Sequence, residues 1–143
     1  MTKNRIVYRR LDKIREKLAL LRSVAEAPFD KFMSDALLHS AAEHALQVSI
    51  QDVIDICAYL VKKAQLRMPE EYRDLPVIAS RLGVFPEELA TKVASMIGMR
   101  NVLVHMYLDV DLSLVHRMLQ DNLDDFNQFA GYVDAYLEKE EIA

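Results

Sequence analysis

Four side chains capable of chemistry lie in one short apolar segment, residues 99–107: Arg100, Asn101, His105 and Tyr107. An ordinary core helix has little use for them. Arg100 is always charged, so burying it without a partner is costly. His105 can give or take a proton near neutral pH. The segment therefore places a group able to transfer protons close to a fixed positive charge.

The spacing of these residues sets a geometric problem. Asn101 and His105 are four residues apart, which places them on one face of a helix. Arg100 and Tyr107, seven apart, also share a face. Arg100 and His105, however, are separated by about 140° on an ideal helix. They converge only if the arginine reaches around, if the helix ends near His105, or if a second copy of the chain contributes.

In a simpler interpretation, residues 99–107 have only a structural role. Short motifs of this kind arise by chance. His105 then caps helix carbonyls, and Arg100 extends its charged end to water at a partly buried helix terminus. Tyr107 is then a packing tyrosine with a hydrated hydroxyl group.

Composition indicates one globular helical domain spanning 1–143. The chain is 52% hydrophobic and 28% charged, with only 3 Gly and 4 Pro, which excludes disorder and favours long helices. The single Cys57 sits among apolar residues, which indicates core packing and fits a reducing, cytoplasmic compartment. The first residues show no signal-peptide pattern, and no apolar run is long enough to span a membrane. With a net charge of -4, any nucleic-acid site must be a local basic cleft.

Apolar periodicity predicts the first two helices. Val7, Leu11, Ile14, Leu18 and Leu21 form one stripe over about residues 4–26, with a solvated opposite face that includes Arg10. After a short connection at residues 29–33, Ser34 or Asp35 is expected to cap a central helix reaching about residue 67. That helix carries a polar stripe of Glu43, Gln47, Gln51 and Asp55. The stripe is an exposed edge, a set of hydrogen bonds to neighbouring helices, or a polar groove or subunit contact.

The second half of the chain shows the same pattern. A polar connector at residues 70–76 leads to a short helix closed by Gly83. The next helix begins at Pro86 and ends with the 99–107 segment. Asp111 is expected to cap one last helix reaching about residue 138, with a solvated face at Asp121, Asp124, Asp125 and Asp134. No strand pattern appears. We predict an all-α, up-and-down bundle of four long helices plus one short helix.

The chain resembles the HEPN superfamily and, within it, the HepT-like toxins of bacterial and archaeal two-gene systems. Residues 100–107, Arg-Asn-Val-Leu-Val-His-Met-Tyr, match the family's R-N-x3-H-x-Y motif. Segments 45–56, 72–75, 82–89 and 110–111 follow the family pattern in the same order, so the resemblance covers nearly the whole chain.

The resemblance implies a metal-independent endoribonuclease without a cofactor. In such proteins two chains form a homodimer, and the motif of each lines one cleft at the interface. An RNA 2′-hydroxyl would attack the adjacent phosphorus, with His105 as general base or acid. Arg100 would bind the phosphate and stabilise the transition state, and Asn101 would orient His105 or hold a phosphate oxygen.

The resemblance also implies a control mechanism. In HepT-like toxins the motif tyrosine, Tyr107 here, is adenylylated by a small partner nucleotidyltransferase that acts as antitoxin and uses ATP as the AMP donor. A phosphodiester at this position would bring negative charge and bulk to Arg100. This arrangement is that of a type VII-like toxin–antitoxin pair.

Two other functions remain open. The chain could be a non-catalytic helical module that binds a nucleotide or docks a nucleotidyltransferase, or it could be only a helical dimer scaffold. The complete set of Arg100, Asn101 and His105 argues against a docking module, which would not need it. Nuclease activity of the purified chain would separate these functions.

Overall fold

The computed structural model describes residues 4–105 and 111–142, without the side chains of Val102, Val104, His105 and Ile142. The described chain is helical, which confirms the predicted all-α class. Four long helices dominate: α1 (Arg5–Ala25), α3 (Ala36–Lys63), α5 (Glu87–His105) and α7 (Leu123–Ile142). Shorter elements join them: α2 (Phe29–Ser34), the 3-10 helix η2 (Tyr72–Asp74), α4 (Leu75–Arg81) and α6 (Leu112–Asp121). No helix within these residues is long and apolar enough to cross a bilayer.

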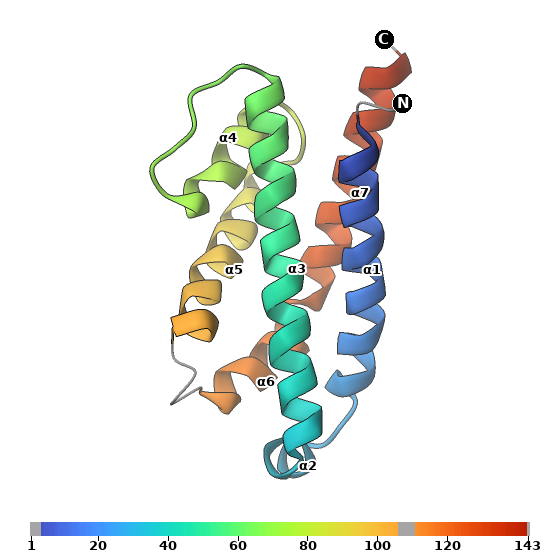
Figure 1. Ribbon diagram of the computed structural model, residues 1–143, viewed down its shortest axis with the longest axis vertical. Coiled ribbons are helices and arrows are strands. Elements are labelled where there is room, and N and C mark those ends of the chain that lie inside the picture. The colour runs from blue at the N-terminus through green and yellow to red at the C-terminus, as the bar shows by residue number, and fades with distance from the viewer. Residues whose placement is uncertain (1–3, 106–110, 143) are drawn as a thin grey trace.

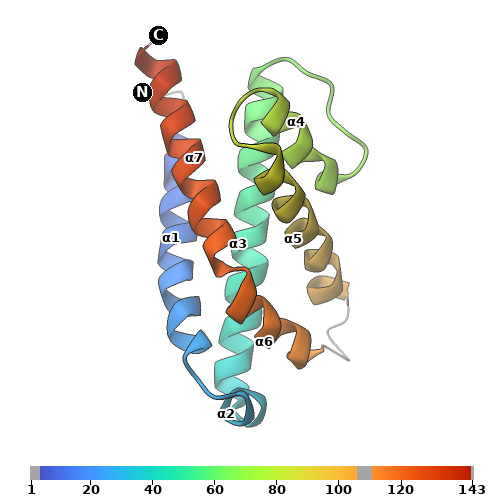
Figure 2. The same ribbon diagram turned by 180° about the vertical axis from the view of Figure 1, so that it is seen from behind.

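The long helices are arranged around α3. Helix α1 packs along α3 and α7, while α4 and α5 cover the other side of α3 (Figure 1). From behind, α7 runs beside α1, and α6 crosses toward the lower end of α5 (Figure 2). The two chain ends lie together at one end of the bundle, where Asn4 Nδ2 donates a hydrogen bond to Glu141 Oε1 at 3.2 Å.

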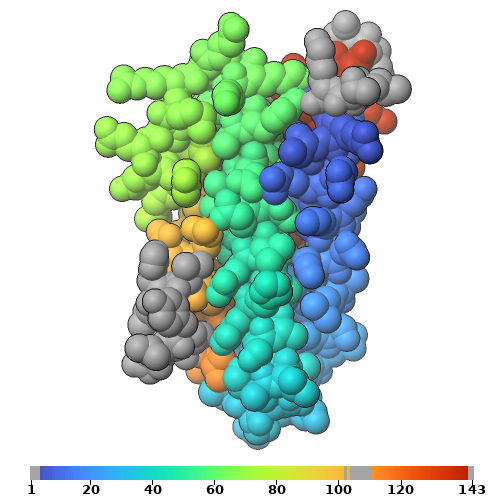
Figure 3. All heavy atoms as spheres, in the orientation of Figure 1, coloured from blue at the N-terminus to red at the C-terminus, as the bar shows by residue number. Residues whose placement is uncertain are grey.

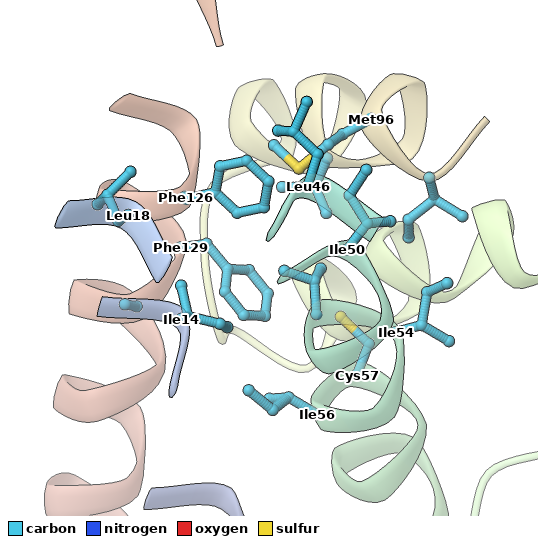
Figure 4. Close-up of a cluster of buried hydrophobic side chains, with 14 of the residues drawn as sticks. Ile14, Leu18, Leu46, Ile50, Ile54, Ile56, Cys57, Met96, Phe126 and Phe129 are labelled. Carbon is cyan, nitrogen blue, oxygen red and sulfur yellow. The ribbon is translucent and has the colours of Figure 1, made fainter. Parts of the chain in front are cut away.

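The core joins side chains from these four helices. Phe126 and Phe129 of α7 project between α1 and α3, and Phe126 points toward Leu46 of α3 and Met96 of α5 (Figure 4). The predicted stripe of α1 is confirmed, because each of its five residues is buried. Cys57 is fully buried, which raises the pKa of its thiol to about 12, so it packs in the core as expected.

Helix caps explain where several helices begin. The Asp35 carboxylate accepts hydrogen bonds from the backbone N–H groups of Leu37 and Leu38, at 3.1 and 3.2 Å. Asp111 accepts one from Leu114 N at 3.2 Å. Both predicted caps are therefore confirmed, because each carboxylate satisfies amide groups that have no partner within the helix.

The number of shorter helices was predicted wrongly. Residues 29–33, expected to be a connection, belong to α2, which buries Phe32. The last helix is broken into α6 and α7 at Asn122, whose Nδ2 donates to Asp125 Oδ2 at 3.3 Å. Asp125 is consequently buried, not part of a solvated face. An asparagine followed by acids in the first turn is a helix-start signal that the apolar periodicity concealed.

A cluster of charged side chains lies at the junction of α1 and α3. Arg10 Nη1 lies 2.9 Å from Asp52 Oδ1 and 2.9 Å from Asp55 Oδ2. Arg10 was predicted on a solvated face, but it is only partly exposed because it folds against α3. Asp52 is buried and its Oδ2 has no hydrogen-bond partner among the described residues. Desolvation outweighs the attraction of Arg10 and raises the pKa of Asp52.

Candidate active site

The end of α5 brings two of the predicted site residues to one cleft. Burial of the predicted inward residues of α5, from Leu89 to Leu103, holds this helix against the core. On its outer side Arg100 is partly buried and Asn101 is exposed. Both line a cleft of about 380 Å³. The structure thus places Arg100 and Asn101 at one cleft, and their proposed roles there stay predictions.

The opposite wall of the cleft is the connector between α3 and α4. After α3 the chain turns through Gln65, which has a φ of 58°, and returns along α5. Tyr72 and Arg73 of η2 line the cleft, together with Glu70, Glu71, Ile54 and Ile97. In Figure 3 the light-green residues of the connector lie directly next to the orange residues at the end of α5.

The positions of the His105 and Tyr107 side chains in the site are not described by the structure. His105 is the last residue of α5, and the helix runs without interruption from Arg100 to it. The two side chains therefore start about 140° apart around the helix. The structure does not describe the side chain of His105, and Tyr107 lies outside the described residues, so the predicted roles of both stay predictions.

A glutamine of α3 holds the backbone at this helix end. Gln47 Nε2 donates a hydrogen bond to the carbonyl oxygen of Leu103 at 3.2 Å. The last carbonyl groups of a helix have no partner within it, so this bond satisfies one of them. Gln47 belongs to the predicted polar stripe of α3, and Asp55 of the same stripe binds Arg10 of α1. At these two positions the stripe makes hydrogen bonds to neighbouring helices.

Arg73 is the cleft residue that the sequence did not reveal as part of the site. A Cβ atom placed on Gly98 would lie 3.6, 3.7 and 3.8 Å from Cζ, Nη2 and Nη1 of Arg73. The guanidinium group thus lies at van der Waals distance from the position of a Cβ at residue 98, so an alanine would fit there and a larger side chain would meet Arg73. A glycine inside a helix, about 1 kcal/mol less favourable than alanine, was the available signal.

Electrostatically, the cleft joins two arginines with two acids. Neither Arg73 nor Arg100 makes an ion pair with any residue that the structure describes. Their N–H groups are available to an anion, because arginine presents several donors in a planar fork. Within residues 4–105 and 111–142, no group of three or more His, Cys, Asp or Glu side chains could hold a metal ion.

Comparison with known proteins shows relatives along almost the whole chain. The messenger-RNA nuclease HepT of Shewanella oneidensis is 29% identical over 105 residues, 73% of this chain and 79% of the relative. The transfer-RNA nuclease HepT of Aphanizomenon flos-aquae is 26% identical over 134 residues, 92% of this chain and 90% of the relative.

A solved structure agrees with these relatives. The tri-AMPylated HEPN toxin of Shewanella oneidensis, determined in complex with its MNT antitoxin, superposes with a TM-score of 0.81 and 25% identity. The match covers 91% of this chain and 97% of the toxin chain. The model of the family described as Ribonuclease HepT-like matches residues 14–133, well over half of the sequence. The chain therefore belongs to the HepT-like ribonuclease family of the HEPN superfamily.

Proposed function

We propose that this protein is the ribonuclease toxin of a type VII-like toxin–antitoxin pair and cleaves RNA without a metal ion. The observation that carries the proposal is the cleft at the end of α5, where Arg100 and Asn101 line one cavity close to the helix terminus formed by His105. Relatives named as nucleases, and a toxin solved with its antitoxin, support the same function.

The proposed chemistry follows from the residue types. Arg100 binds the scissile phosphate through paired N–H donors and stabilises the charge that builds up on its oxygens. His105 removes the proton of the RNA 2′-hydroxyl, which attacks the adjacent phosphorus, or protonates the leaving 5′-oxygen. Asn101 orients His105 or holds a phosphate oxygen. Because the nucleophile is the 2′-hydroxyl, RNA is cut and DNA is not.

The 140° between Arg100 and His105 supports a site shared by two chains of a homodimer. Two α5 helices approaching at an interface can bring Arg100 of one chain to His105 of the other, which one straight helix cannot do. In this arrangement each single domain, residues 1–143, supplies half of each of two sites.

Control of the nuclease is proposed to act through Tyr107. A small nucleotidyltransferase antitoxin transfers AMP from ATP to the phenol oxygen and releases pyrophosphate. The attached phosphodiester competes with RNA for Arg100 by charge and by bulk. The AMPylated toxin in complex with an MNT antitoxin is the relative that supports this step.

The test is RNA cleavage by purified protein in the presence of a chelator. We expect products ending in a 2′,3′-cyclic phosphate, or in its opened form, and we expect Arg100→Ala and His105→Ala each to abolish cleavage while circular dichroism stays helical. Activity lost with chelator and restored by added metal would refute the mechanism. Wild-type cleavage by both variants would refute the site.

A further inference from the structure

The cleft extends beyond the residues of the proposed reaction, to η2. Tyr72 and Arg73 form its outer wall, opposite Arg100 and Asn101. The cavity of about 380 Å³ falls in the range of small-ligand sites, so it has room for more than one phosphate group. The proposed chemistry uses neither Tyr72 nor Arg73.

Contact with α5 orients the Arg73 side chain. Its Cζ, Nη2 and Nη1 atoms are almost equally far, 3.6–3.8 Å, from the Cβ position of Gly98, so the plane of the guanidinium group faces the helix. The N–H donors lie in that plane and consequently point sideways along the helix surface. Residues 98 and 100 point to different sides of α5, so the two arginines come together only because both side chains line the same cleft.

Neither Tyr72 nor Arg73 makes a side-chain hydrogen bond or ion pair with a described residue, although Arg73 packs on Gly98 of α5. Arg73 is exposed and forms no ion pair with a described residue, although Glu70, Glu71 and Asp74 are its neighbours in sequence. Tyr72 is 58% exposed beside it. Proteins often bind single-stranded nucleic acid through an exposed aromatic ring next to an unpaired arginine. The base stacks on the ring, and the phosphate accepts hydrogen bonds from the guanidinium N–H groups.

We propose that Tyr72 and Arg73 bind the nucleotide adjacent to the scissile bond, Arg73 through its phosphate and Tyr72 by stacking on its base. This inference rests on the proposed function and assigns to η2 the substrate-binding half of the site. Arg73 contributes to substrate affinity, whereas Arg100 acts on the reacting phosphate.

The two acidic side chains of the cleft limit how strongly its charge attracts RNA. Glu70 and Glu71 line the same cavity, so their two negative charges offset those of Arg73 and Arg100. The cleft therefore does not attract RNA by net charge, and binding depends on directed hydrogen bonds and stacking. Removing the acidic charges with Glu70→Gln and Glu71→Gln together is expected to tighten RNA binding several-fold at low salt.

The test measures binding of a fluorescein-labelled single-stranded RNA of mixed sequence to the full-length His105→Ala protein over a salt series. Adding Arg73→Ala should weaken binding about tenfold and reduce the slope of log K against log salt by about 0.7, the value for one phosphate contact on a single strand. Adding Tyr72→Leu should weaken binding about tenfold with little change in slope, because stacking carries no charge.

The matched control is Arg81→Ala, which removes an exposed arginine from α4 outside the cleft and should leave the affinity and the slope unchanged. In the otherwise wild-type protein, Arg73→Ala should raise KM about tenfold and change kcat by less than about twofold. Arg73→Lys should have a KM between those of the wild-type protein and Arg73→Ala, because lysine keeps the positive charge and lacks the planar set of guanidinium N–H donors.

The outcomes separate the two proposals. If wild-type protein cuts RNA and Arg73→Ala matches it in affinity, slope and KM, the role of η2 is refuted and the proposed function stands. If Arg73→Ala lowers kcat without changing KM, Arg73 takes part in the reaction and the binding role is refuted. If wild-type protein neither binds nor cuts RNA, both proposals fail.

Discussion

In the proposed mechanism, control of the nuclease depends on a single hydroxyl group, that of Tyr107. Tyr107→Phe removes the acceptor of AMP and none of the groups assigned to cleavage. We expect the variant to keep most of the RNA-cleaving activity and to lose protection by the nucleotidyltransferase. The measurement is intact-protein mass after incubation with the partner and ATP, paired with RNA cleavage by the same sample.

Two results would contradict this mechanism. An adenylyl group located on another residue would show that Tyr107 is not the acceptor. An adenylyl group on Tyr107 that leaves cleavage unchanged would show that modification does not block Arg100. Omitting ATP from the incubation is the control that separates modification from simple binding of the partner.

Single residues were predictable from the sequence where their roles are local. Arg100 and Asn101 were selected by residue type and motif, and they line one cleft, but their roles there stay predictions. Arg73 was not predictable as a cleft residue, because its contact with Gly98 joins two elements through the tertiary fold. The prediction that Arg10 lies on a solvated face was wrong for the same reason. Periodicity within α1 does not reveal that Asp52 of α3 lies next to it.

For the helices, the sequence predicted two starting points correctly but predicted the number of helices wrongly. Asp35 and Asp111 cap their helices by local hydrogen bonds, which a short stretch of sequence is sufficient to indicate. The break at Asn122 was missed because apolar residues continue through it in helical spacing. At that break Asn122 Nδ2 donates a hydrogen bond to Asp125 Oδ2, a contact that apolar periodicity does not reveal.

The end of α5 offers a prediction of its own. Gln47→Leu removes the donor to the Leu103 carbonyl and should destabilise the protein by about 1 kcal/mol. It should also lower kcat several-fold, because the bond holds the backbone two residues before His105. Gln51→Leu is the control, since Gln51 donates only within α3, to Asp55 at 2.9 Å.

Chemical denaturation and RNA cleavage of the two variants measure both effects. Equal kcat values for Gln47→Leu and Gln51→Leu would mean that the hydrogen bond to Leu103 stabilises the fold without positioning the site. A larger loss of activity in Gln51→Leu would contradict the assignment altogether.

For the whole molecule we predict a homodimer whose interface includes α5. Light scattering at micromolar concentration should give twice the 16.4 kDa of one chain. A sharper test mixes inactive Arg100→Ala and His105→Ala proteins. If each site joins Arg100 of one chain to His105 of the other, half of the randomly mixed dimers keep one intact site, which restores about a quarter of wild-type activity.

Each alternative has a distinct result in the mixing experiment. A site built within one chain gives no recovery, because every heterodimer site lacks one of the two residues. A monomer that cuts RNA would refute the dimer prediction itself. Mixing either variant with itself is the baseline for both comparisons.

The Arg10–Asp52–Asp55 contact predicts how stability depends on pH. The pKa of Asp52 is raised above the ordinary 3.8, so the folded state binds a proton more tightly than the unfolded state. The favourable contribution of Asp52 is therefore complete below pH 3.8 and is lost as pH rises through its folded pKa. Asp52→Asn should remove this dependence and be at least as stable as wild type at pH 7.

Arg10→Ala is the contrasting variant, because it leaves the buried Asp52 carboxylate without its arginine. We expect its free energy of unfolding to fall by about 2–3 kcal/mol at neutral pH. This is less than for breaking a fully buried ion pair, because the Arg10 side chain is 34% exposed. Urea denaturation at pH 4 and pH 7 measures both variants. A large loss of stability in Asp52→Asn at pH 7 would contradict the assignment.

The position of Phe126 and Phe129 has a consequence for protein synthesis. Both side chains come from α7, which is made after α1 and α3, yet they fill the space between those two helices. Until α7 has left the ribosome, α1 and α3 can pair with each other but cannot enclose a core. Chains cut short before Leu123 lack both rings, so the support behind α5 stays incomplete. We therefore expect incomplete synthesis of this protein, or a frameshift anywhere before α7, to leave the cleft unassembled.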